Sequence, residues 1–181
     1  MTSIEYAKAS DRQELLDFLL SVFRRNTPGH KPFDYIYPDL FEPDDETMGR
    51  HAVVREDGRI VSCVGAYPML LRIGGCKVPT LGIGQVATAE GSLGKGFMTA
   101  LLRHQLERGA REGAVVAWLG GRHDRYSRFG FECASLSFDY AIDTHSLGRV
   151  ERRRDVATAA PEDVLTTGLF AMRLHGQATV D

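Results

Sequence analysis

The segment from Leu81 to Met98, LGIGQVATAEGSLGKGFM, limits the fold more than any other part of this chain. It begins as an apolar, strand-like run to about Thr88, continues as a polar turn rich in glycine, and enters a helical pattern near Gly96. Glycines let a ligand approach the backbone closely, and the first N–H groups of a helix have no acceptor within the helix. This order of strand, turn and helix therefore predicts an anion cradle, and the expected ligand carries phosphate.

Hydrophobic periodicity predicts a mixed sheet with helices on both of its faces. We expect Ser10 and Gln13 to form a capping box at the start of the first helix, and Asp57-Gly58 to make a tight hairpin turn. The strand at 114–119 is almost wholly apolar, which predicts a central strand covered on both faces. Strands are expected at 3–9, 51–56, 59–72, 77–88, 114–119 and 135–142, amphipathic helices at 10–25 and 97–112, and a short helix at 122–128.

Two regions fall outside this regular pattern. The segment 26–46 is rich in proline and aromatic residues and is too apolar for a disordered linker, and so long a loop in a compact domain is usually functional. From Gly148 onward the periodicity is lost. We therefore expect one domain over 1–145 and a C-terminal extension of uncertain structure over 146–181.

Composition narrows the partners and the compartment. A net charge of −2 gives no reason to expect nucleic acid as a partner, and no apolar run approaches the roughly 20 residues that cross a membrane. The polar N-terminus does not read as a signal peptide. Three widely spaced cysteines without a C-x-x-C pair or clustered histidines favour a reduced, cytoplasmic protein without a metal site.

A second motif follows the turn after some thirty residues, Tyr126-Ser127-Arg128-Phe129-Gly130-Phe131. Together with Leu93-Gly94-Lys95-Gly96 it resembles the GNAT superfamily of N-acetyltransferases, whose signature is Q/R-x-x-G-x-G/A and then Y-x-x-x-G-F. The resemblance covers about residues 3–142. The layout looks closest to bacterial acetyltransferases of the enhanced-intracellular-survival (Eis) type, on the cues PGHKPFDYIYPDLF, DGRIVSCVGAYP and VAT. It departs from the signature at Leu93, where Gln or Arg is expected, and at Met98, where a small residue is expected.

This resemblance implies an α/β (α+β) fold with a central mixed, mostly antiparallel sheet, and an acetyl-CoA-dependent N-acetyltransferase. Tyr126 would be the general acid to the leaving thiolate. The aromatic segment would line the pocket of a small-molecule or protein amine, through Phe33, Asp34, Tyr35 and Tyr37, unless these aromatics only pack the loop. Backbone and N–H groups of the strand end and the turn would hold the cofactor, the implied residues being Val86, Ala87, Thr88, Leu93, Gly94, Lys95, Gly96, Phe97 and Met98.

Several alternatives stay open on the sequence alone. No general base stands out, because Gln85 is the one strongly polar side chain of the strand before the turn; Asp34, Asp39, Glu42 or the C-terminal carboxylate could serve through a water. Leu93, Met98 and the missing base also fit a non-catalytic acyl-CoA-binding or regulatory module. A third reading gives the apolar segment 165–174 a role in assembly, as part of a homo-oligomer.

Overall fold

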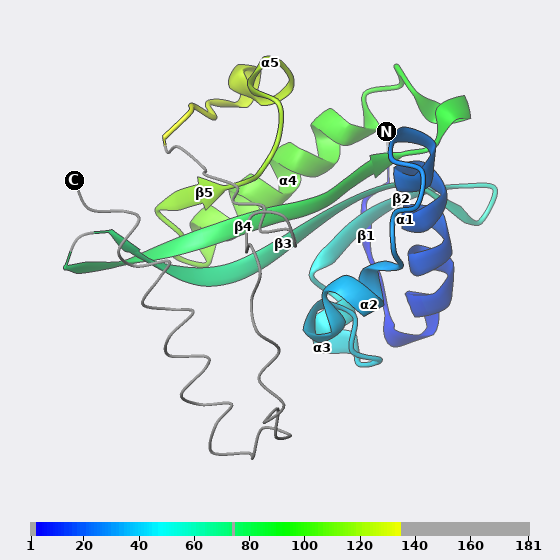
Figure 1. Ribbon diagram of the computed structural model, residues 1–181, viewed down its shortest axis with the longest axis horizontal. Helices are drawn as coiled ribbons and strands as arrows, with labels where there is room; N and C mark the ends of the chain where they lie inside the picture. Colours follow the sequence, from blue (N-terminus) through cyan, green and yellow to red (C-terminus); the bar gives the residue numbers. More distant parts are fainter. Residues whose placement is uncertain (1–2, 74, 135–181) are drawn as a thin grey trace, which may run out of the picture. The chain divides into compact units, whose positions relative to one another are not determined.

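The computed structural model describes residues 3–73 and 75–134, and these residues form a mixed α/β fold around a five-stranded sheet (Figure 1). The strands follow their order in the chain, β1-β2-β3-β4-β5, and only the β4–β5 pair is parallel. The mixed, mostly antiparallel sheet is thus confirmed. Their bounds are β1 Glu5–Tyr6, β2 His51–Glu56, β3 Arg59–Ile73, β4 Cys76–Thr88 and β5 Val116–Trp118.

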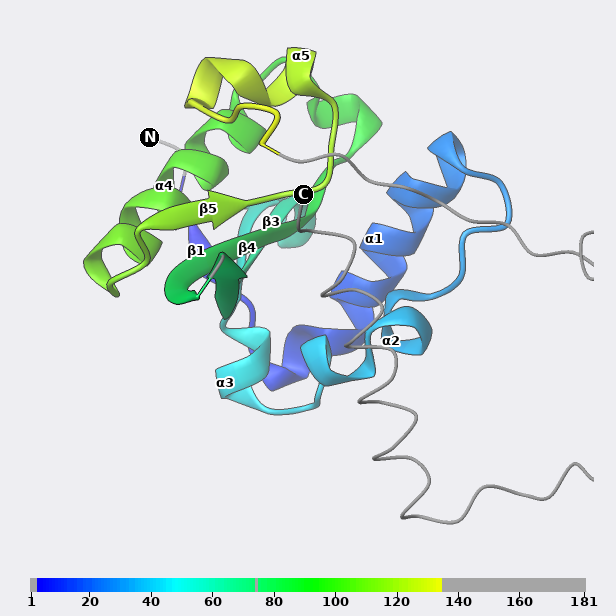
Figure 2. The same ribbon diagram turned by 60° about the vertical axis from the view of Figure 1, so that its left-hand side comes forward.

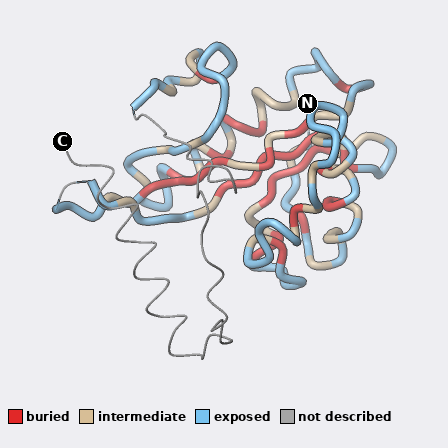
Figure 3. The backbone as a smooth tube through the Cα atoms, viewed as in Figure 1, coloured by how far each residue is buried: buried red, intermediate tan, exposed pale blue. Residues whose placement is uncertain are grey.

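The two long helices cover opposite faces of the sheet, as the periodicity predicts (Figure 2). Helix α1 (Arg12–Asn26) packs with Val53 of β2 in one core, and helix α4 (Phe97–Arg111) packs with Ala52 and Val54 in the other. Successive residues of a strand point to opposite faces, so one strand contributes to both cores. The buried residues accordingly run along the middle strands between the helices (Figure 3).

Short helices connect these elements. The segment expected as a loop contains α2 (Phe33–Ile36), a 3-10 turn (Pro38–Leu40) and α3 (Asp45–Met48). The short helix expected at 122–128 is present as α5 (His123–Tyr126) followed by a 3-10 turn (Ser127–Phe129). Two further 3-10 turns, Ala9–Asp11 and Glu90–Ser92, precede α1 and the glycine turn.

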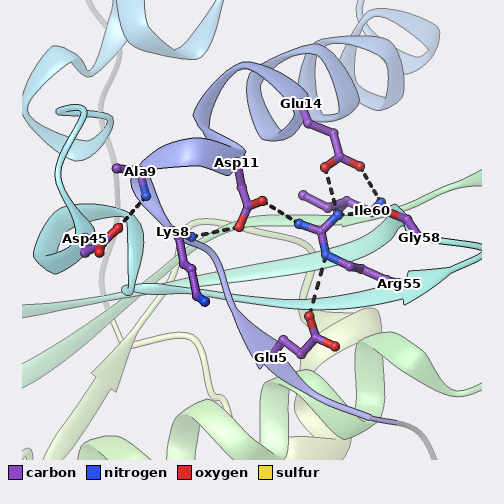
Figure 4. Close-up of polar contacts among 9 residues, drawn as sticks. All are labelled: Glu5, Lys8, Ala9, Asp11, Glu14, Asp45, Arg55, Gly58 and Ile60. Atoms are coloured by element: carbon purple, nitrogen blue, oxygen red, sulfur yellow. Dashed lines mark hydrogen bonds and ion pairs between the residues drawn. The ribbon is translucent and has the colours of Figure 1, made fainter.

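A network around Arg55 fixes the start of α1 on the sheet (Figure 4). Its guanidinium lies 2.8 Å from Asp11 and from Glu14 and 3.6 Å from Glu5, and the other Glu14 oxygen accepts from Ile60 N at 2.8 Å. Asp11 also accepts from the N–H of Lys8 at 2.9 Å. This carboxylate, rather than the expected capping box of Ser10 and Gln13, caps the chain before α1.

The prediction of a central strand at 114–119 is wrong for the described residues. Strand β5 has three residues and stands at the end of the described strand order, with Val116 and Trp118 exposed. An apolar run predicts burial but does not say which neighbours cover it. The expected strand at 135–142 and the extension 146–181 lie outside the described residues.

Candidate cofactor cleft

The glycine turn adopts the backbone that an anion cradle requires. Gly94 and Gly96 have φ of 77° and 82°, in the left-handed region that favours glycine, and a Cβ at either position would meet no atom within 4 Å. Gly96 caps α4, whose first helical hydrogen bond runs from Ala100 N to Gly96 O at 3.0 Å. The N–H groups of Phe97 and Met98 therefore lack an acceptor within the helix and are free to bind a ligand.

The turn opens on a cleft of about 710 Å³, lined by the end of β4, the start of α4, the C-terminal end of α1 and the stretch 122–128 around α5. Eight of the nine residues that the sequence assigns to the cofactor line this cleft, and the ninth is Lys95. The eight are Val86, Ala87, Thr88, Leu93, Gly94, Gly96, Phe97 and Met98. Open space beside two glycines and unpaired helix N–H groups fit a phosphate-bearing ligand.

Lys95 points to the protein instead of the cleft. Its Nζ lies 2.7 and 2.9 Å from the two carboxylate oxygens of Glu56, and Ser92 Oγ donates to the same carboxylate at 2.5 Å. The hydrogen bond from Lys95 lowers the pKa of Glu56, and the bond from Ser92 adds to the effect. Glu56, at the end of β2, thus anchors the glycine turn through Ser92 and Lys95, a role that the sequence did not suggest.

Four arginines to which the sequence analysis gave no role in binding also line the cleft: Arg25, Arg122, Arg125 and Arg128. Arg25 lies 3.3 Å from Glu90, and Arg122 pairs with Asp124 at 2.6 Å. Among the described residues that line the cleft, these four side chains stand against one carboxylate, that of Asp124, and this excess of positive charge suits a polyanion. Three of them stand in the stretch 122–128, so a count of basic residues around Tyr126 was the available signal.

Tyr126 is buried beside the cleft rather than on its wall. Its side chain is 7% exposed, packs in the core on the α4 side of the sheet, and meets Phe131 edge-on at 6.1 Å between ring centroids. A Cβ at Gly121 would lie 2.7 Å from the Tyr126 ring, so the glycine makes room for it. Arg125, the residue before it, and Arg128, two residues after it, do line the cleft.

The residues expected around the acceptor are separated from one another. Phe33 lies in the core against Phe23 and Phe41, and Asp34 pairs with Arg12 at 3.2 Å. Tyr35 and Tyr37 are exposed on the segment that follows α1. None of the four residues expected at the acceptor is in the wall of the cofactor cleft, whereas Val22, Phe23 and Asn26 at the end of α1 are.

The described residues contain neither a candidate metal site nor a membrane-spanning helix. No group of three or more His, Cys, Asp or Glu side chains in 3–73 and 75–134 is arranged to hold a metal ion. No helix in the same ranges combines the length and the apolar character that a bilayer crossing needs.

The family follows from a match over most of this structure. The family model described as an acetyltransferase (GNAT) domain matches residues 3–134, so the chain belongs to this family of acetyltransferases. An uncharacterized N-acetyltransferase of Streptomyces avermitilis is 30% identical over 95 residues, which are 51% of this chain and 23% of that protein. The chain therefore spans about a quarter of that curated relative's length.

Solved structures confirm the fold. Eis1 of Mycobacterium abscessus superimposes with a TM-score of 0.58 at 21% identity, over 71% of this chain and 31% of its own. Glucosamine-6-phosphate N-acetyltransferase of Arabidopsis thaliana gives 0.57 at 15% identity, over 79% of this chain and 99% of its own. The predicted GNAT fold is confirmed, and Eis1 is among the structures that share it. At these identities the likeness concerns the fold alone.

Proposed function

We propose that the protein binds acetyl-CoA in the cleft and transfers the acetyl group to a primary amine of a small molecule or a protein. One observation carries the proposal: the end of β4, the glycine turn and the start of α4 converge on a single cleft. Two observations support it: the chain belongs to an acetyltransferase family, and the backbone of the glycine turn fits a phosphate group.

The phosphate end of the ligand would lie at the start of α4. The N–H groups of Gly96, Phe97 and Met98 offer directed donors, and the helix dipole adds about 0.3–1 kcal/mol per favourable charge contact. Arg125 and Arg128 add positive charge to the lining of the cleft, where Arg128 Nη2 donates to Thr99 Oγ1 of α4 at 3.3 Å. Leu93 contributes no side-chain hydrogen bond, so the backbone and these arginines replace the Gln or Arg of the family signature.

The reacting end would lie along the last residues of β4. Bound acetyl-CoA supplies a thioester whose carbonyl carbon is open to attack by an unprotonated amine. Backbone groups of Val86 and Thr88 would hold the arm that carries the thioester, and Tyr126 would give its phenolic proton to the departing thiolate sulfur.

Titration calorimetry with acetyl-CoA tests the cleft. We expect saturable binding by the wild type and at least ~100-fold weaker binding by Gly96→Glu, because the new carboxylate fills the cradle and the backbone has φ of 82°. Gly113→Glu is the matched control: it has φ of 95° and adds the same charge beyond the other end of α4. Equal binding by both variants, or none by the wild type, contradicts the proposal.

Release of free thiol over a panel of amines tests the chemistry. For an accepted amine, we expect Tyr126→Phe to lower kcat about 10²-fold while the dissociation constant of acetyl-CoA stays unchanged, because a positioned acid contributes about 10²–10⁴-fold. Unchanged turnover at every pH would remove Tyr126 from the mechanism.

A non-catalytic acyl-CoA-binding module is the second candidate. The exposed Leu93, 57% accessible at the position of the signature Gln or Arg, favours it, because its side chain cannot help to order the phosphates. Saturable acetyl-CoA binding without thiol release across the whole amine panel is the result that this function predicts. Turnover with any amine excludes it.

A further inference from the structure

Three neighbouring strands each bring one polar side chain to a buried cluster on the α1 face of the sheet. The hydroxyl of Tyr67 on β3 lies 2.8 Å from His51 Nε2 on β2 and 2.5 Å from Gln85 Oε1 on β4. His51 is fully buried, and its Nδ1 lies 3.1 Å from Met48 O. Its ring packs against Phe41 at a tilt of 34°, with centroids 4.9 Å apart. The Tyr67 hydroxyl donates its one proton to Gln85 Oε1 and accepts from His51 Nε2, which places the single N–H of the neutral imidazole on Nε2.

The sequence makes room for this cluster with a glycine. Gly65 is paired with His51 on one side and with Gly84 on the other. A Cβ at Gly65 would overlap the Tyr67 hydroxyl and lie 2.8 Å from Gln85 Oε1. With no side chain there, the Tyr67 phenol reaches across its own strand to Gln85.

Gln85 lies at a β-bulge in β4, where the alternation of side chains between the two faces of the sheet is interrupted. The register shifts between Cys63–Ala87 and Gly65–Gly84, so β4 carries an extra residue opposite β3. Ile83 packs in the core on the α4 side, yet Ala87, four residues later, packs in the core on the α1 side. A regular strand would keep both on one face. The bulge thus decides how Val86 and Ala87 are presented to the cleft.

The backbone at this bulge needs an external support. Gln85 has φ of 47°, in the left-handed region that a residue with a side chain rarely adopts and keeps only where its surroundings fix it. The Gln85 side chain is buried, and the hydroxyl of Tyr67 on the neighbouring strand donates a hydrogen bond to its Oε1, which fixes the side chain in place.

We propose that Tyr67, buttressed by His51, is a positioning residue that holds Gln85 in the left-handed bulge and thereby sets Val86–Thr88 for the acetyl donor. This inference rests on the proposed function for its ligand. The cluster acts through backbone position and does not carry the proton of the amine. Burial lowers the pKa of His51 to about 4, far below the roughly 10.4 of an alkyl ammonium, so it is a poor acceptor for that proton.

The test compares three variants. Tyr67→Phe removes the hydroxyl that holds Gln85, Gln85→Gly makes φ of 47° accessible without support, and the double variant combines them. Tyr6→Phe is the matched control, because it also removes one 2.8 Å tyrosine–histidine hydrogen bond, to His104, but on β1, which contributes no residue to the cluster. The readouts are the dissociation constant of acetyl-CoA and the backbone ¹³C and amide signals of residues 84–87 in the free protein.

We expect Tyr67→Phe to weaken acetyl-CoA binding about tenfold and to shift the Gln85 signals away from left-handed values. The double variant should bind within about threefold of the wild type, because glycine pays little for the left-handed backbone. A purely structural loss would not be rescued by a second substitution. Tyr6→Phe should leave both readouts unchanged.

Two results overturn the inference. In the first, Tyr67→Phe keeps the wild-type signals of residues 84–87 and the wild-type affinity for acetyl-CoA. In the second, the double variant binds acetyl-CoA no more tightly than Tyr67→Phe alone. Failure of the proposed function looks different, because the wild type itself then binds no acetyl-CoA. In that case the backbone signals of residues 84–87 in the free protein decide. If Gln85 keeps left-handed values in Tyr67→Phe, the supporting role of Tyr67 is rejected. If Tyr67→Phe loses these values and the added Gln85→Gly restores them, the supporting role is upheld.

Discussion

The turn before α4 and the segment between α1 and β2 both stood out in the sequence as candidate binding regions. In the structure, the turn lines the cleft, whereas the segment is divided between the core and the exposed surface. The turn has the left-handed glycines, the helix start and the cleft that its residues predict. The segment was expected to line an acceptor pocket, yet Phe33 and Phe41 are buried in the core and Asp34 is paired with Arg12. Tyr35 and Tyr37, in contrast, are exposed.

The difference lies in what each region uses to bind. A phosphate cradle is built from backbone N–H groups, whose directions follow from local φ and ψ, and glycine spacing reports these directly. A pocket wall is built from side chains, and an aromatic side chain packs as readily into a core as around a ligand. Local sequence therefore predicts the first kind of site more safely than the second.

The largest effect that tests this contrast is on stability. Phe41→Ala removes a fully buried ring, and we expect the free energy of unfolding to fall by about 3–5 kcal/mol. Tyr35→Ala, at a side chain 76% exposed, should change it by less than about 0.5 kcal/mol. Urea unfolding of both variants gives the two values. If Phe41→Ala lowered the free energy of unfolding only slightly, the segment between α1 and β2 would again be a candidate pocket wall.

A pH titration of stability probes the same core at His51. Burial lowers the folded-state pKa of His51 from 6.5 to about 4, so between these values the unfolded chain binds a proton that the folded chain does not. Stability should therefore fall as the pH drops from about 6.5 to 4, by on the order of 3 kcal/mol. Unfolding curves of His51→Gln should lose most of this slope, while those of His123→Gln, an exposed histidine, should keep it.

The smallest effect concerns the charged wall of the cleft. Arg125→Gln should weaken acetyl-CoA binding only about twofold to fivefold, because an exposed charge contact contributes about 0.3–1 kcal/mol and salt screens it. The effect should shrink as the ionic strength rises. Arg103→Gln, exposed on α4 and absent from the cleft wall, is the control in the same calorimetric series. Equal losses in both variants would show that net charge, rather than the position of Arg125, matters.

Much of the fold follows from local patterns. The bounds of β2, β3, β4 and α4 agree with the periodicity to within one or two residues, and the hairpin turn at Asp57-Gly58 has the two positive φ angles expected of it. In these elements propensity, pattern and turn residues agree with one another. The apolar run that became β5 was a single signal, and among the described residues β5 is short, with Val116 and Trp118 exposed.

By itself, the sequence determined the strand, turn and helix of the cradle, the two apolar faces of the helices and the family motifs, because each depends on residues close together in the chain. The tertiary structure alone decided three things: the anchoring of Lys95 by Glu56, the arginines of α1 and α5 on one cleft, and the meeting of His51, Tyr67 and Gln85. These contacts join residues 16 to about 100 positions apart. Such pairs become neighbours only when strand register and helix packing are fixed, and no local pattern records which distant partner a polar side chain will find.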